Sequence, residues 1–233
     1  MGKIFRYECR RLLWNKFFIG LAVVLLLYGA FVLHAVTILG VAHTAPFSPW
    51  SFGDYLSRMM PLLWIGMLFF LTFYTSPQAR RAAILMDATP MPPKQYAPAL
   101  TGGALLTLLC MVEAAVFYGR MFHWYSWGSL LLPALVTLLP TLVFALGSGW
   151  LAGQIRPWLV YVWMAVPFLL AALPLPEALG LWNGSFFTAY PLTLETLDPA
   201  FVVPVGVTVV QVVLLAAGTV LLILGSNRRK VMR

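Results

Sequence analysis

The sequence contains very little charge. Of its 233 residues, 61% are hydrophobic and only 9% are Asp, Glu, Lys or Arg, and the mean hydropathy is +0.88. An ordinary soluble domain carries about 25% charged residues. This composition excludes a soluble globular domain and predicts an integral membrane protein.

Cysteine and histidine are equally scarce. Cys9 precedes the first long apolar run and Cys110 lies inside the third, so the two are expected at depths too different for one disulfide bridge. The three histidines, at positions 34, 43 and 123, are scattered along the chain and form no metal-binding pattern with the cysteines. We therefore expect neither a structural disulfide nor a metal site.

Motifs for catalysis are also missing. None of the lysines, at positions 3, 16, 94 and 230, precedes Ser or Thr, so the chain has no phosphate-binding loop. Ser148 lies between two glycines, a pattern that suggests the nucleophile of a protease buried in the bilayer, but it is expected near the inner face and the histidines toward the outer one. A general base must come within about 3 Å of its nucleophile. We predict no catalytic residue and no enzymatic activity in this chain.

Long charge-free stretches are what the sequence does contain. A helix needs roughly 20 apolar residues to cross a hydrocarbon core of about 30 Å. The runs are continuous, whereas the strands of a membrane barrel alternate in polarity, so helices are preferred. The sequence predicts one all-α transmembrane domain over residues 1–233, with six spans near 17–42, 57–75, 98–118, 128–153, 158–175 and 203–225.

Basic residues predict how these spans are oriented. With six spans and an inner N-terminus, only Arg58 and Arg120 of the 15 basic residues fall outside. Acids carry little weight in this rule, although Asp54, Glu177 and two others (Glu195 and Asp198) also fall outside. We predict a multi-pass protein of the cell membrane with cytoplasmic termini. The net charge of +8 then reflects orientation and attraction to anionic lipid rather than nucleic-acid binding.

Two segments outside the spans have patterns of their own. Residues 3–16 place Lys3, Arg6 and Arg10 at helical spacing, which predicts an amphipathic helix at the membrane surface; a disordered basic leader is the alternative. The apolar run that follows is longer than the roughly 7–15 residues of a signal peptide, so we expect an uncleaved span. Residues 76–96 begin with Ser-Pro and carry three prolines after Thr89, which predicts a short cytoplasmic helix that ends at Thr89 or, alternatively, a polar linker.

The order of these segments resembles the permease subunit of the second type of ATP-binding-cassette (ABC) exporters. That family has six spans, an amphipathic elbow helix before the first, and a cytoplasmic coupling helix between the second and third. The segment QARRAAILMDATPMPPKQY matches the coupling region, although Gln78 replaces its usual acidic residue and Pro93 stands where a polar or basic residue is common. The outer segment 175–203 resembles the half-inserted helices of the family. The resemblance assigns coupling to the ATPase to six residues: Arg80, Arg81, Asp87, Thr89, Pro90 and Lys94.

The resemblance also implies partners. This chain would bind no cofactor, and ATP and Mg would be held by two separate ATPase subunits that work with a pair of permeases, identical or related. A membrane assembly or immunity protein that transports nothing remains an alternative, and an ion-coupled carrier is a third. A carrier usually needs ionisable residues near the midplane, and Glu113 is the only acid expected within a span.

Glu113 is expected to have a polar partner, because a charged carboxylate in hydrocarbon costs free energy. Arg58 is the first choice at similar depth, and His34 and Arg120 are the others. A structural ion pair and a protonated acid bonded to a hydroxyl both remain open, as does a role in substrate contact or gating. On the fourth span, the small residues Ala145, Gly147, Gly149 and Gly153 predict a helix-packing face.

Overall fold

The computed structural model describes residues 2–37, 49–78, 96–122, 128–189 and 201–231, and these residues form helices and no strand. Five of the helical stretches are long and apolar enough to cross a membrane: Lys16–Ala35, Pro49–Thr75, Ala97–Met121, Leu130–Ile155 and Val205–Gly225. The predicted all-α membrane fold is therefore confirmed at this level. Leu159–Ala172 is a sixth, shorter apolar helix.

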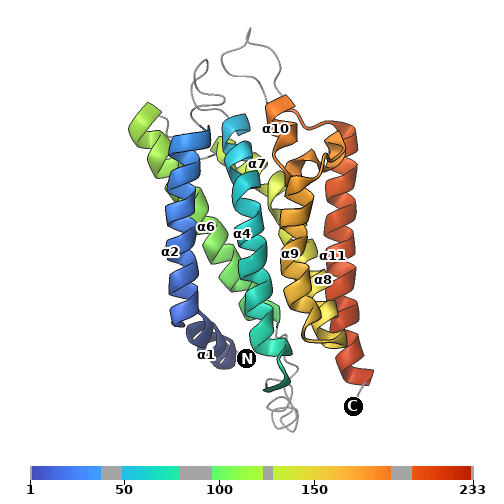
Figure 1. The fold of residues 1–233 in the computed structure, drawn as a ribbon. Helices are drawn as coiled ribbons and strands as arrows, with labels where there is room; N and C mark the ends of the chain where they lie inside the picture. The colour runs from blue at the N-terminus through green and yellow to red at the C-terminus, as the bar shows by residue number, and fades with distance from the viewer. Residues whose placement is uncertain (1, 38–48, 79–95, 123–127, 190–200, 232–233) are drawn as a thin grey trace.

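The helices form a bundle with α4 (Pro49–Thr75) at its centre (Figure 1). α4 contacts α2 (Lys16–Val32), α6 (Tyr96–Phe122), α8 (Leu139–Ile155) and α9 (Leu159–Ala172). Its residues are mostly buried, whereas α2 and α11 (Val205–Val231) are mostly exposed on the outside of the bundle and α6 is exposed along one face. α1 (Gly2–Leu13) and the C-terminal end of α11 lie at the same end of the bundle.

α1 is a separate amphipathic helix, as the spacing of residues 3–16 predicts, and it ends at Leu13. Arg6 and Arg10 are exposed, while Leu12 is buried and lies against Gly102 of α6. The chain changes direction at Asn15, whose side-chain oxygen accepts a hydrogen bond from the backbone N–H of Phe17 at 3.1 Å. This cap satisfies one of the free donors at the start of α2.

α4 begins at Pro49, well before the start at residue 57 expected from the sequence. Asp54 was expected in an outer loop, and this expectation is wrong: Asp54 lies inside the helix and is only 3% exposed. Glu113 is therefore not the only acid within a span-length helix. Asp54 can occupy this position because its charge is paired with Arg58 within the same helix.

The fourth predicted span, 128–153, consists of two consecutive helices, α7 (Gly128–Thr137) and α8. They meet at Leu138, and Pro140 occupies the first turn of α8. Proline has no backbone N–H to donate to the carbonyl four residues earlier, so it interrupts the helical ladder at this point. The Leu138 N–H donates to the Ala134 carbonyl at 2.9 Å across the junction, so the two helices together form one span-length run, Leu130–Ile155.

α8 packs closely against α11 through glycines, and α11 is its most extensive neighbour. A side chain at Gly147 would collide with the backbone carbonyl of Gly218, and one at Gly218 would lie 2.7 Å from the backbone of Phe144. On another side of α8, Gly149 faces Leu68 and Gly153 faces Thr75, both on α4. The predicted small residues do lie at helix contacts, but they face two neighbouring helices and do not form one packing face. Their small size allows helix backbones to approach more closely than larger residues would permit.

Between α9 and α11 the chain folds back into the bundle at the end opposite α1 (Figure 1). α9 stops at Ala172 because prolines follow at 174 and 176, and the chain then forms the 3₁₀ helix η2 (Glu177–Trp182) and α10 (Ser185–Ala189). The Trp182 ring lies 5.3 Å from that of Trp64 in the middle of α4. Gly184 joins η2 to α10 with a φ of 77°, a conformation that favours glycine.

Candidate functional site

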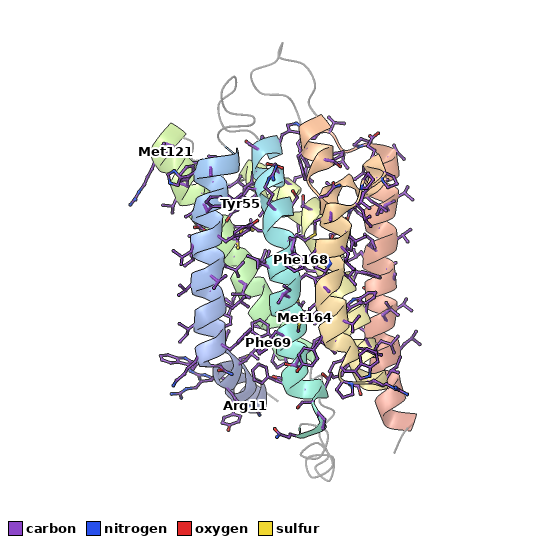
Figure 2. All side chains as sticks on the ribbon, in the orientation of Figure 1. Arg11, Tyr55, Phe69, Met121, Met164 and Phe168 are labelled. Atoms are coloured by element: carbon purple, nitrogen blue, oxygen red, sulfur yellow. The ribbon has the colours of Figure 1, made fainter. Side chains whose placement is uncertain are left out.

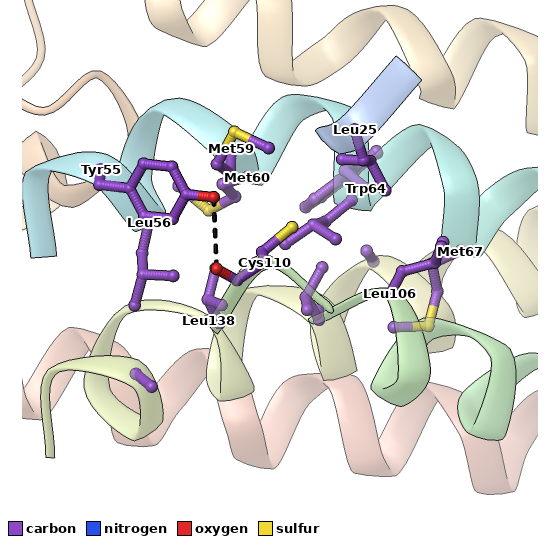
Figure 3. Close-up of a cluster of buried hydrophobic side chains, with 14 of the residues drawn as sticks. Leu25, Tyr55, Leu56, Met59, Met60, Trp64, Met67, Leu106, Cys110 and Leu138 are labelled. Atoms are coloured by element: carbon purple, nitrogen blue, oxygen red, sulfur yellow. Dashed lines mark hydrogen bonds between the residues drawn. The ribbon is translucent and has the colours of Figure 1, made fainter. Parts of the chain in front are cut away.

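Tyr55 and Glu113 bring two polar side chains together where α4 and α6 pack against each other. The Tyr55 hydroxyl of α4 lies 3.3 Å from Glu113 Oε2 and 3.3 Å from the backbone carbonyl oxygen of Cys110, both on α6. Figure 3 shows the bond to Cys110 among buried apolar side chains, with Met59 and Met60 close to the hydroxyl. A phenol has one hydrogen, so Tyr55 can donate to only one of these oxygens at a time. Tyr55 therefore links the two helices at the level of the carboxyl group.

α2 closes this junction from a third side. A side chain at Gly29 would collide with Glu113 Oε2 and would lie 2.9 Å from the Tyr55 hydroxyl. Gly29 is buried, so the carboxyl group lies directly against the backbone of α2. Three helices thus meet around one carboxyl group, and the absence of a side chain at Gly29 makes the approach possible.

Arg58 does not take the position expected of it. Its Nε donates to Asp54 Oδ2 at 3.0 Å, one helical turn away on α4, and the Arg58 side chain is 34% exposed. The predicted first choice of partner for Glu113 therefore differs from the structure, in which the Tyr55 hydroxyl contacts Glu113 and Asp54 pairs with Arg58. A bonded hydroxyl was one of the alternatives that the sequence left open.

His34 and Arg120 do lie near Glu113. All three line a partly open cavity of about 510 Å³ between α2 with its π-helical end η1 (Leu33–Thr37) and α6. The His34 ring packs edge-on against Phe117 with centroids 4.7 Å apart, and both His34 and Arg120 are exposed. The structure thus brings His34 and Glu113 to one cavity and places Arg58 elsewhere.

Ser148 has a structural contact. Its hydroxyl lies 2.5 Å from the Phe144 carbonyl oxygen, to which it donates, and accepts a hydrogen bond from Trp163 Nε1 at 2.6 Å. Trp64 of α4 in turn donates to the Trp163 carbonyl at 3.0 Å. These bonds hold α9 against α8 and α4.

The residues assigned to coupling lie outside the described residues: Arg80, Arg81, Asp87, Thr89, Pro90 and Lys94. The described chain approaches them from both sides, ending at Gln78 after α4 and resuming at Tyr96 in α6. Within the part of the chain that the structure describes, no group of three or more His, Cys, Asp or Glu residues could hold a metal ion.

Sequence reasoning missed Tyr55, Gly29 and Asp54. Asp54 and Arg58 are four residues apart, which is the spacing of an ion pair on one helix, so extending the second helix back to Pro49 would have indicated their contact. The sequence offers no comparable signal for Tyr55 or Gly29. Their importance depends on which faces of α2, α4 and α6 meet.

Comparison with models of known protein families, with curated proteins and with solved structures finds no match for this chain. The fold itself indicates the class, a multi-pass α-helical membrane protein.

Proposed function

We propose that the chain is the permease subunit of an ABC exporter, working as a pair of permeases with two separate ATPase subunits. The observation that carries this proposal is the pair of short outer helices, η2 and α10, folded into the bundle between α9 and α11. The resemblance implies half-inserted outer helices at this point of the chain. An amphipathic helix, α1, also precedes the first apolar helix, in the order that the family has.

The proposed topology has six spans, with α9 as the fifth crossing. An even number of crossings fits the position of α1 and the C-terminal end of α11 at the same end of the bundle (Figure 1). The excess of basic residues near both ends of the chain then favours a cytoplasmic location for this end in the cell membrane. In this orientation α1 is the elbow helix, and η2 and α10 face the outside.

Segment 76–96 would transmit movement from the ATPase subunits, caused by nucleotide binding, to the helices of this chain. It joins the end of α4 to the start of α6, and these two helices pack together through the Tyr55 and Glu113 contact. α4 also contacts α2, α8 and α9, so a displacement of its cytoplasmic end would reach most of the bundle. By resemblance, closure of the ATPase pair would rotate this segment and rearrange a path between the two permeases.

Cysteine labelling tests the topology. In a variant with Cys9 and Cys110 replaced, a cysteine at Glu177 should react with a membrane-impermeant thiol reagent added to intact cells, because Glu177 is exposed at the outer end. A cysteine at Gln78, exposed at the opposite end, should react only after the membrane is opened. Labelling of Gln78→Cys in intact cells would contradict both the orientation and the coupling assignment.

The function is tested by copurification followed by measurement of nucleotide hydrolysis. The full chain, tagged and expressed in its native host, should copurify with an ATPase whose activity depends on the permease. Replacing Arg80, Arg81 and Asp87 by alanine should leave membrane insertion intact but weaken ATPase association or separate hydrolysis from export. A chain that copurifies with no ATPase would instead favour an assembly or immunity protein. A triple variant that binds and exports like the parent would show that segment 76–96 is only a linker.

A further inference from the structure

The cavity between α2 and α6 has the Glu113 carboxyl group in a largely apolar wall, which His34 and Arg120 also line. Its volume of about 510 Å³ lies within the range of roughly 300–1,000 Å³ that is usual for small-molecule sites. Leu26 of α2 and Val112, Val116 and Phe117 of α6 supply apolar surface, and Glu113 is the only acid among the described residues that line it. A purely apolar cavity open to a bilayer would simply hold a lipid chain, whereas this one offers a specific polar contact.

Among the described residues Glu113 forms no ion pair, although His34 and Arg120 line the same cavity. Tyr55 supplies one hydrogen bond to Oε2, but a hydroxyl carries no charge. An acidic residue within a span is costly, and residues of this kind often mark a ligand or ion pathway. The carboxyl group is therefore placed to receive a positive charge from outside the chain.

We propose that this cavity binds an amphiphilic organic cation, with Glu113 holding the positive group and the apolar walls holding the rest of the molecule. Phe117 lies one helical turn from Glu113 on the same face of α6 and also lines the cavity, so its ring would add a cation–π contact. The proposal does not depend on the exporter function, because it concerns binding by this chain alone.

The order of the acidic and basic residues along α6 favours such a ligand over an ordinary phospholipid. Arg120 lies seven residues beyond Glu113, about 10 Å farther toward the end of the helix and the membrane surface. Tyr55 and Met121 lie toward this same end, opposite Arg11 and Phe69 (Figure 2). A phosphatidylethanolamine carries its ammonium group outward of its phosphate, whereas this cavity has its acid inward of its base. A lone cation, or a zwitterion with its anionic group outward, fits this order.

Two probes of the same shape and opposite charge test the proposal. The purified full chain in a neutral detergent should bind tetraphenylphosphonium saturably at one site, as measured with radiolabelled ligand. Tetraphenylborate should not compete for this site. Glu113→Gln should weaken tetraphenylphosphonium binding about tenfold or more, because a desolvated charge pair is lost. Equal binding of the two probes, or unchanged binding by Glu113→Gln, would overturn the proposal.

A second pair of variants keeps the test informative if Glu113→Gln fails to fold. Val116→Trp would fill the cavity without changing its charge and should abolish binding. Leu108→Trp adds the same side chain to the same helix at a position that is 54% exposed and does not line the cavity, so it should bind like the parent. Equal binding by these two variants would show that the cation lies elsewhere. Competition by phosphatidylethanolamine, but not by phosphatidylglycerol, in nanodiscs would overturn the argument from charge order.

Discussion

Replacing Gly147 by leucine is expected to destabilise the protein by about 3 kcal/mol or more, at the upper end of what overpacking usually costs. The new side chain would meet the backbone carbonyl of Gly218, which cannot move without separating α8 from α11. A flexible side chain could rotate away, but a helix backbone cannot. Thermal unfolding of the purified protein, followed by circular dichroism or by a thiol-reactive dye on the buried Cys110, measures the effect.

Gly206→Leu is the matched control for this substitution. Gly206 lies on α11, the same helix as Gly218, yet nothing is within 4 Å of the position where its side chain would begin. Its replacement should change stability by no more than about 0.5 kcal/mol, as is usual for surface positions. If Gly147→Leu unfolds at the same temperature as Gly206→Leu, α8 and α11 do not pack through their glycines.

Asp54→Asn is expected to cost about 1.5–3 kcal/mol, because it removes a charge-assisted hydrogen bond between a buried carboxylate and an arginine whose side chain is 34% exposed. The substitution preserves shape but leaves the guanidinium of Arg58 without a counter-charge inside a span-length helix. Unfolding should therefore begin at a lower temperature than in the parent. Adding Arg58→Leu should recover most of the loss, because the double variant contains neither charge.

Glu113→Gln tests whether Glu113 is independent of the ion pair between Asp54 and Arg58. Glutamine can still accept a hydrogen bond from Tyr55, so the loss of stability should be well below that of Asp54→Asn. Arg58→Gln should not restore the stability of Glu113→Gln, because Arg58 pairs with Asp54. Mutual rescue between positions 58 and 113 would contradict the contacts described above.

The fold class could be predicted from the sequence because the hydrocarbon core of a bilayer imposes a simple requirement on the backbone. Backbone groups in a bilayer must be satisfied within each segment, so a continuous apolar run of sufficient length has few alternatives to a helix. The start of α4 was missed because Asp54 and Arg58 were treated as marking a boundary. Charges end a span only when they are unpaired, and these two neutralise each other under the cover of η2 and α10.

The partner of Glu113 could not be predicted because depth and direction are separate quantities. Arg58 and Tyr55 occupy nearly the same depth on α4, and the sequence gives that depth from the residue number. Which of the two faces α6 depends on the rotation of α4 about its axis, and this is determined by packing against several other helices at once. The cavity was beyond prediction for the same reason, since it depends on the crossing of α2 and α6.

The shortness of α9 bears on the membrane as well as on the protein. Its 14 residues extend about 21 Å, less than a hydrocarbon core of about 30 Å. If α9 crosses as proposed, the bilayer thins beside it, flanking residues reach outward, or a second subunit covers it. Such hydrophobic mismatch costs a fraction of a kcal/mol for each ångström. It favours residence in thin bilayers, so the lipid composition around this protein becomes part of what determines its stability.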